Sequence, residues 1–205
     1  RDRHDCLEDT DASFEEISRM FGETVANLVE GVTKLTRVQY STMEEQQMEN
    51  LRKMFMAMSK DIRVILIKIA DRLHNMRTLG SMPPHKQMKI TSETIYLFAP
   101  LAYRLGLFAI KSELEDLTLK YRFPEDYRQI ENKIRETEAK RSRFIEKFNA
   151  PIIEKLRAND IDFEISGRVK SIYSIWSKMQ RKHIPFEEIY DIFAIRIVFK
   201  PSPLI

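Results

Sequence analysis

The stretch from Asp61 to Thr78 constrains the fold more than any other part of the sequence. Apolar residues recur there at three- and four-residue spacing, as on the core-facing side of an amphipathic helix: Ile62, Ile65, Leu66, Ile69, Leu73 and Met76. Asp71, Asn75 and Thr78 fall at i, i+4 and i+7, which places them on one shared face. Burying an aspartate and an asparagine beside an apolar stripe costs free energy unless something binds them. A metal ion held jointly with the distant His4-Asp5 pair would do so.

Helical periodicity extends well beyond this stretch. Periodic apolar positions run from Phe14 to about Asn159, and with only five glycines in 205 residues they predict a mostly helical first part. Helices are expected to start at Ser13 and at Thr42, because each is followed three residues later by glutamate, as in a capping box. A further start is expected at Ser92.

Prolines and glycines predict where these helices end. Gly80 and Pro83-Pro84 should close the helix that begins near Asp61, and Pro100 should kink a helix over 95–105 rather than break it. Gly106 should separate that helix from one that runs to about Lys120.

Phe123-Pro124 marks the next boundary. A long charged helix is expected over 125–149, and a final helix is expected to open at Pro151 and run through Arg157.

The pattern changes near Asn159. Alternation of apolar and polar residues from Ile161 to Ile165 predicts a strand, residues 171–182 return to helical periodicity, and the apolar run 192–199 predicts a second, buried strand. Helices followed by strand–helix–strand indicate an α+β chain, in which an all-helical domain joins the start of an α/β domain.

Composition narrows the functional classes. The chain has 34 basic and 31 acidic residues, closely interleaved, which is typical of solvated helix faces rather than of a nucleic-acid-binding surface. Its apolar runs are too short to span a bilayer. The single cysteine, Cys6, excludes an internal disulfide and fits a reducing cytosol, so a cytoplasmic protein is expected. We interpret Cys6 as a buried small apolar residue rather than a thiolate ligand.

Six motifs, in order along essentially the whole chain, resemble those of the Rel/SpoT family, a branch of the HD phosphohydrolase superfamily that makes and destroys the alarmone (p)ppGpp. The motifs are His4-Asp5-Cys-Leu-Glu8-Asp9-Thr10, Gly31-Val-Thr-Lys-Leu35, Lys60-Asp-Ile-Arg-Val64, Ala70-Asp-Arg-Leu-His-Asn-Met-Arg-Thr-Leu79, Gly167-Arg-Val-Lys-Ser-Ile-Tyr-Ser-Ile175 with Lys178-Met179, and Tyr190-Asp-Ile-Phe-Ala-Ile-Arg196. A lone His-Asp dipeptide would carry no information, whereas six ordered motifs do.

The resemblance implies a metal-dependent hydrolase site in the first part. His4, Asp5 and Asp71 match the ligands of Mn²⁺, an ion that lowers the pKa of bound water and offsets charge on the attacked phosphoryl group. Glu8 and Asp9 match carboxylates that activate or position that water.

Two further residues of this part, Asn75 and Thr78, match positions that contact the nucleotide. His74 and His85 are expected to be packing or surface residues rather than ligands. Without the resemblance, residues 8–11 could be an acidic helix cap and residues 71–77 a solvated helix end.

A second site is expected near the C-terminus. Five Lys or Arg residues and no acid lie between Ser166 and Pro185, and Lys170, Ser174 and Lys178 recur every four residues on one helix face. A strand that leads into the N-terminus of a basic helix is a favourable place for a polyphosphate.

The resemblance assigns specific roles in this second site. Arg168, Lys170, Ser174 and Lys178 match ATP-binding positions, and Asp191 matches a catalytic Mg²⁺ ligand. The alternative is a solvated basic helix with an aspartate in a turn.

We therefore expect a fragment of a bifunctional enzyme, because both ends look cut. Residues 1–122 would be an HD-type hydrolase domain with a truncated N-terminus, 123–159 a helical connector, and 160–205 the first part of a nucleotidyltransferase-like synthetase domain. The parent would hydrolyse the 3′-pyrophosphate of (p)ppGpp to GDP or GTP, and make (p)ppGpp from ATP and GDP or GTP. The isolated chain should be inactive, and ribosomal or regulatory partners would bind outside it.

Two alternatives compete with this interpretation. A synthetase-only enzyme with a regulatory helical domain is disfavoured, because the chain keeps His4, Asp5, Glu8 and Asp9. A non-enzymatic helical module that binds nucleic acid or a partner is suggested by the basic stretch 128–147, but six acids between residues 125 and 146 weaken it.

Overall fold

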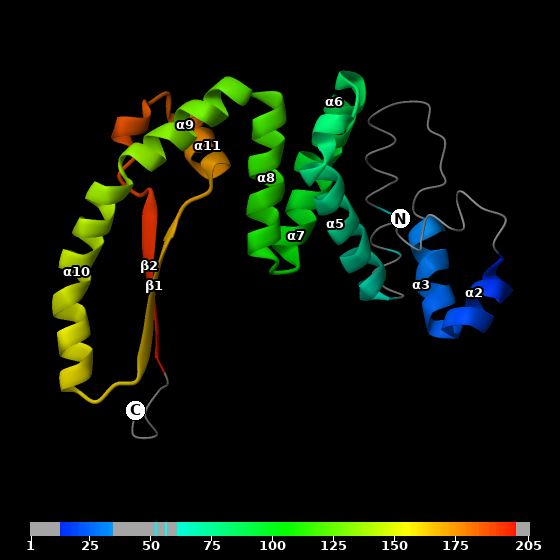
Figure 1. Ribbon diagram of the computed structural model, residues 1–205, viewed down its shortest axis with the longest axis horizontal. Coiled ribbons are helices and arrows are strands. Elements are labelled where there is room, and N and C mark those ends of the chain that lie inside the picture. The colour runs from blue at the N-terminus through cyan, green and yellow to red at the C-terminus, as the bar shows by residue number, and fades with distance from the viewer. Residues whose placement is uncertain (1–12, 35–51, 53–55, 57–60, 200–205) are drawn as a thin grey trace. The chain divides into compact units, whose positions relative to one another are not determined.

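The computed structural model describes residues 13–34, 52, 56 and 61–199, and the chain divides into two compact units between Thr118 and Leu119. The first unit is helical, and the second combines helices with a two-stranded sheet (Figure 1). The predicted α+β organisation, helices followed by strand–helix–strand, is confirmed. Residues 123–159 and 160–199 fall in the same compact unit, and the division into three functional parts stays a prediction.

The first unit is built from helices joined by short turns. Its elements are α2 (Phe14–Phe21), α3 (Glu23–Lys34), α5 (Ile62–Arg77), the 3₁₀ turn η2 (Leu79–Ser81), α6 (Pro84–Glu93), the π-helical segment η3 (Thr94–Phe98), α7 (Ala99–Arg104) and α8 (Phe108–Arg122), whose last residues pass into the second unit. The capping box predicted at Ser13 is confirmed. The Ser13 hydroxyl accepts from the Glu16 N–H, and the Ser13 N–H donates to the Glu16 carboxylate. The start predicted at Thr42 lies outside the described residues.

Helix α5 forms where the sequence predicts it, capped by the Asp61 carboxylate, which accepts from the Arg63 N–H at 2.9 Å. Four of the six predicted stripe residues are buried: Ile65, Ile69, Leu73 and Met76. The prediction is wrong for Ile62 and Leu66, which are 48% and 40% exposed.

The close approach of α3 to α5 accounts for that difference. Val64 is buried instead, and one of its methyl carbons lies only 3.0 Å from where a Cβ would stand on Gly31 of α3. Val64 therefore makes the close contact with α3, whereas Ile62 and Leu66 stay exposed.

The next helix begins earlier than predicted. Pro84 stands at the first position of α6, where its missing N–H is no loss, and Ser92 lies inside the helix, so the start predicted at Ser92 is wrong. Helical chain then runs through η3 and α7 without a break at Pro100, as predicted. In η3 the Ala99 N–H donates to the Thr94 carbonyl, a wide turn that gives room to the proline ring.

Gly106, with φ +75°, separates α7 from α8 as predicted. The Phe123-Pro124 boundary is confirmed too, because α9 (Pro124–Glu136) starts there. The expected start at Pro151 is wrong, because this proline lies inside α10 (Glu138–Ala158) and the break falls at Thr137. The Thr137 hydroxyl donates to the carbonyl groups of Lys133 and Ile134, which satisfies the C-terminus of α9.

The rest of the second unit is β1 (Phe163–Val169), α11 (Ile172–Lys182), the 3₁₀ turn η4 (Phe186–Glu188) and β2 (Phe193–Phe199). The strands pair antiparallel, from Phe163 opposite Phe199 to Val169 opposite Phe193. The prediction that 192–199 is a buried strand is wrong, because β2 alternates half-buried and exposed positions, as expected of a sheet covered on one face.

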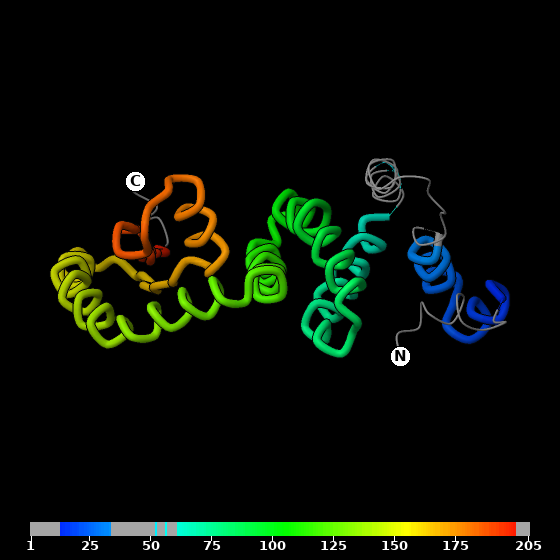
Figure 2. Tube along the Cα trace, turned by 90° about the horizontal axis from the view of Figure 1, so that it is seen from above, coloured from blue at the N-terminus to red at the C-terminus, as the bar shows by residue number. Residues whose placement is uncertain are grey.

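The core of this unit lies between α9, α11 and η4. Its buried residues are Ile130, Ile175, Phe186 and Ile189. Helix α10 runs alongside the two-stranded ribbon (Figures 1 and 2), where the Phe144 and Phe193 rings meet at 6.4 Å. In the part of the chain that the structure describes, no helix is long and apolar enough to cross a membrane.

Burial on α5 gives a first stability prediction. Ile69→Ala should lower the free energy of unfolding by about 2–5 kcal/mol, because it leaves a cavity where the side chain is 1% exposed. Ile67→Ala on the same helix, at 36% exposure, is the matched control and should cost about 1 kcal/mol or less. Urea unfolding followed by circular dichroism measures both, and equal losses would contradict the packing of α5.

Two glutamates on α8 have opposite electrostatic environments. Glu115 is 7% exposed, and burial raises the pKa of its carboxyl although the Lys111 ammonium lies 2.8 Å away. Glu113 is half-exposed, and its two hydrogen bonds from the Arg77 guanidinium lower the pKa of its carboxyl. The first group binds a proton more tightly in the folded chain, and the second binds it less tightly.

The two glutamates should therefore affect stability with opposite dependence on pH. Relative to Glu115→Gln, the wild type should lose stability as pH rises from about 4.5 towards the raised pKa of Glu115. Relative to Glu113→Gln, it should be more stable at neutral pH, and this advantage should vanish as pH falls through the lowered pKa. Urea unfolding at a series of pH values tests both, and profiles of the same sign would refute the assignment.

Candidate functional site

Helix α5 places Asp71 and Asn75 one turn apart, both half-buried. The Asn75 side-chain amide donates to one carboxylate oxygen of Asp71 at 3.3 Å, so the two predicted site residues contact each other directly. Thr78 is exposed at the C-cap of the helix, and its hydroxyl donates to the His74 carbonyl at 3.1 Å. The hydroxyl therefore serves the helix end in this structure.

Two arginines hold the polar end of α5 in place, and sequence reasoning missed both. The Arg72 side chain is 15% exposed, donates to Glu93 at 2.7 Å and lies 4.3 Å from the centre of the Phe98 ring. Arg77 forms a bidentate pair with Glu113 on α8, at 2.6 and 2.9 Å. These contacts fix α5 against α6, η3 and α8 and thereby set the direction in which Asp71 and Asn75 point. The only signal in the sequence for the role of Arg72 is its position next to the apolar stripe of the helix.

The other residues predicted for this site, His4, Asp5, Glu8 and Asp9, lie outside the described residues, as does Cys6. Among the residues that the structure does describe, no group of three or more His, Cys, Asp or Glu side chains is placed to hold a metal ion. Asp71 supplies a carboxylate, a ligand type that suits hard divalent ions. His74 and His85 are both exposed.

The second candidate site lies where β1 leads into α11. The Lys170 N–H donates to the Ile192 carbonyl at 2.7 Å, which ties the start of the helix to the segment before β2. Ser171 caps α11 and accepts from the Ser174 N–H at 3.3 Å, and the two hydroxyls are 2.7 Å apart. The local sequence therefore gives a strand, a capped turn and a basic helix in immediate succession.

Three of the residues predicted for this site converge. The ammonium groups of Lys170 and Lys178 both donate to the Asp191 carboxylate, one to each oxygen. These hydrogen bonds, that of Lys170 first, hold the pKa of Asp191 well below its usual range. The carboxylate is about half exposed, so solvent and ligands reach it.

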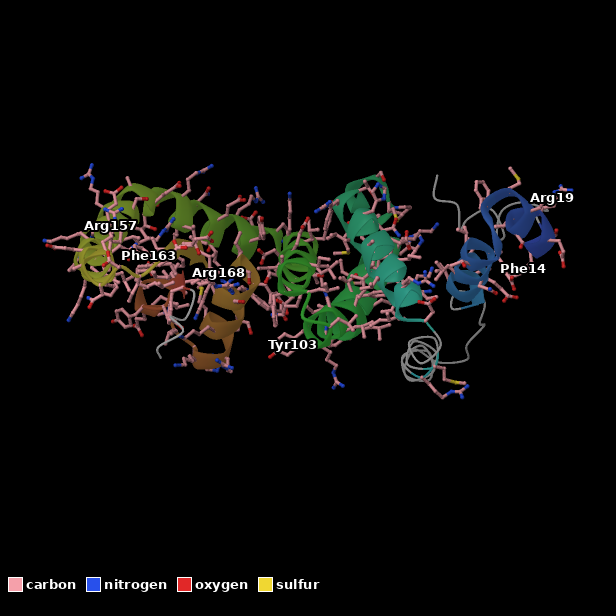
Figure 3. All side chains as sticks on the ribbon, turned by 90° about the horizontal axis from the view of Figure 1, so that it is seen from below. Phe14, Arg19, Tyr103, Arg157, Phe163 and Arg168 are labelled. Atoms are coloured by element: carbon pink, nitrogen blue, oxygen red, sulfur yellow. The ribbon has the colours of Figure 1, made fainter. Side chains whose placement is uncertain are left out.

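The structure places the other two predicted residues of this site differently. The Ser174 hydroxyl, between the two lysines on α11, is engaged with Ser171. Arg168 is exposed on β1, where Figure 3 labels it, opposite Ala194 in the register.

A long-range contact orients α11 from behind. The single tryptophan of the chain, Trp176, donates its indole N–H to Asp126 of α9 at 2.7 Å and packs against Phe123 and Tyr173. A cavity of ≈ 70 Å³ opens beside this contact, between α9, α11 and η4. Sequence reasoning missed the pair, because nothing local connects residues 126 and 176.

Comparison with known proteins identifies two regions in the chain. Residues 3–108 match the model of the HD domain, and residues 167–203 match the model described as a region found in RelA/SpoT proteins. The first match spans the Asp71 site, and the second spans Arg168, Lys170, Lys178 and Asp191.

Curated relatives match almost the entire chain. A probable guanosine-3′,5′-bis(diphosphate) 3′-pyrophosphohydrolase from Synechocystis is 50% identical over 95% of the chain and 26% of its own length. The bifunctional (p)ppGpp synthase/hydrolase SpoT of Escherichia coli is 45% identical over 97% and 28%. A GTP pyrophosphokinase from Myxococcus xanthus is 46% identical over 98% and 27%. The chain thus spans about a quarter of the length of these relatives.

The chain belongs to the HD domain family, and it also carries a region that matches RelA/SpoT proteins. Membership of a family of metal-dependent hydrolases implies a divalent metal ion.

Proposed function

We propose that this chain is part of a bifunctional alarmone enzyme that both hydrolyses and synthesises (p)ppGpp. The observation that carries the proposal is the pairing of the two regions in one chain. The part with the Asp71–Asn75 contact matches the HD domain, and the part in which Lys170 and Lys178 meet Asp191 matches the RelA/SpoT region. The similar proteins include a probable pyrophosphohydrolase, a pyrophosphokinase and a bifunctional enzyme.

In the proposed hydrolase half, His4, Asp5 and Asp71 hold Mn²⁺, which when bound supplies a water of lowered pKa and offsets phosphoryl charge. Glu8 and Asp9 accept the proton of the attacking water and orient it. Water adds to the 3′-pyrophosphate of (p)ppGpp, which releases pyrophosphate and GDP or GTP.

The α5 side chains complete the proposed hydrolase half. The amide of Asn75 orients the Asp71 carboxylate through their hydrogen bond, and Asn75 and Thr78 contact the nucleotide.

In the proposed synthetase half, Arg168, Lys170, Ser174 and Lys178 bind ATP, and Asp191 holds Mg²⁺, which when bound neutralises charge between phosphates. The 3′-hydroxyl of GDP or GTP attacks the β-phosphorus of ATP, and AMP leaves. Lys170 and Lys178, which contact this carboxylate, place positive charge where the phosphates of ATP would bind.

The place and partners of the whole protein belong to the same proposal. We propose a cytoplasmic location, which the single cysteine supports, and ribosomal or regulatory partners that would bind outside this chain.

The two halves predict separable losses in the full-length protein. Asp71→Ala should lower the rate of ppGpp hydrolysis more than about 100-fold and spare synthesis, because it removes a ligand of the hydrolytic metal. His74→Ala, an exposed change on the same helix, is the control and should leave both rates within about two-fold. Turnover assays with excess Mn²⁺ and Mg²⁺ measure this, and equal loss of both activities in a folded Asp71→Ala protein would reject the assignment.

The converse result is expected for the second site. Asp191→Ala should abolish synthesis while hydrolysis continues, because the ion that aligns ATP loses a protein ligand. Glu188→Ala, an exposed acid close by in sequence, serves as the control and should retain synthesis. A normal rate of ppGpp formation by the Asp191→Ala protein would show that this aspartate is structural.

A further inference from the structure

The charged residues of the proposed synthetase site pair with one another in this structure. Lys170 lies just after β1, Lys178 two helical turns further along α11, and Asp191 just before β2. Each lysine donates to a different oxygen of the same carboxylate. The two lysines proposed to bind a phosphate therefore form ion pairs with the aspartate proposed to bind a cation.

This pairing has different consequences for one ligand and for two. A metal-free polyphosphate that draws the lysines away leaves the Asp191 carboxylate facing another anion. A divalent cation that takes the carboxylate leaves two ammonium groups beside a positive ion. When both ligands arrive, the lysines move to phosphate oxygens and the carboxylate to the cation, and every charge again has an opposite partner.

We propose that Lys170, Lys178 and Asp191 form an ion-pair lock that couples polyphosphate binding to divalent-cation binding. Each ligand weakens the hold of the lysines on the carboxylate, so each strengthens the binding of the other, by the same factor in both directions. The proposal rests on the proposed function of this site and adds to it that ATP and metal are bound together rather than independently.

The expected change in ligand affinity follows from the solvent exposure of the three side chains. The three side chains are between 25% and 49% exposed, and an ion pair of this kind changes an equilibrium by roughly 1.4- to 5-fold. Two such pairs on one carboxylate together span about 2- to 25-fold, and we expect the affinity for a single ligand to change by about 3- to 10-fold within that range. A change of this size lets the substrate displace the ion pairs, and it is large enough to measure.

The first experiment uses an anion without metal. Isothermal titration calorimetry measures inorganic tripolyphosphate binding to the 205-residue chain in EDTA, for wild type and Asp191→Ala, with Glu188→Ala as a charge-matched control. Asp191→Ala should bind about 3- to 10-fold more tightly because it frees both lysines, whereas Glu188→Ala should change affinity by less than about two-fold. Circular dichroism confirms that all three proteins are folded.

The second experiment uses a cation without anion. Electron paramagnetic resonance measures Mn²⁺ binding in the Asp71→Ala background, so that the proposed hydrolase site does not contribute. Lys178→Ala should bind Mn²⁺ about three-fold more tightly than Lys182→Ala, which removes an equal charge from the last turn of the same helix.

The outcomes separate the lock from the proposed function. If wild type binds tripolyphosphate with Mg²⁺ but Asp191→Ala shows no gain in EDTA, the lock is wrong and the synthetase assignment stands. An equal gain for Glu188→Ala, or equal Mn²⁺ affinity of the two lysine variants, also overturns the lock. If no protein binds tripolyphosphate under any condition, both proposals fall. If the gain is confined to Asp191→Ala but the full-length wild type makes no ppGpp, the lock stands and the synthetase assignment is wrong.

Discussion

The first unit depends on the buried face of α5. Ile65, Ile69 and Met76 have 1% exposure or less, and the helix that carries them also carries Asp71 and Asn75. Burial of these side chains sets the rotation of the helix, and with it the direction in which the polar face points. Arg72 and Arg77 complete the constraint, because each ties the polar end of α5 to a different neighbour. The chemistry proposed for Asp71 therefore rests on packing on the opposite side of the same helix.

In the second unit, too, the buried face of a helix sets the direction of its polar face. Ile175 buries one face of α11 against α9 and η4, and Trp176 locks the helix through Asp126. The basic face that remains meets Asp191, which comes from the segment before β2. Because the Lys170 N–H also bonds to the Ile192 carbonyl, the backbone as well as the charges holds the lysine and the aspartate together. The site is thus assembled by strand pairing and helix packing together.

The sequence predicted local structure well and long-range contacts poorly. The capping box at Ser13, the boundary at Gly106 and the strand–helix–strand order follow from local residues, and the structure confirms them. The helix start predicted at Pro151 is wrong, because proline suits the first turn of a helix yet here lies inside α10. Contacts such as Trp176 with Asp126, 50 residues apart, depend on how helices pack, and no local pattern encodes them.

For the candidate sites, too, the sequence predicted local features but not long-range contacts. The spacing of Lys170, Ser174 and Lys178 predicted a common helix face, but it could not reveal that both lysines would bind Asp191. Asp71 and Asn75 meet as the four-residue spacing requires. The roles assigned to His4, Asp5, Glu8 and Asp9 rest on the motif alone.

The π-helical segment η3 fixes the phase of α7, which continues the same helical run. A π turn holds one residue more than the α-helical turn it replaces, so it shifts all later side chains by about 100° around the helix axis. Ala99, Leu101 and Ala102, which follow the segment, are buried. Deleting a single residue from Thr94–Phe98 would restore an ordinary helix and turn these three side chains by about 100° relative to the residues before the segment. A deletion there would therefore change the packing of all of α7, whereas a substitution would change one side chain.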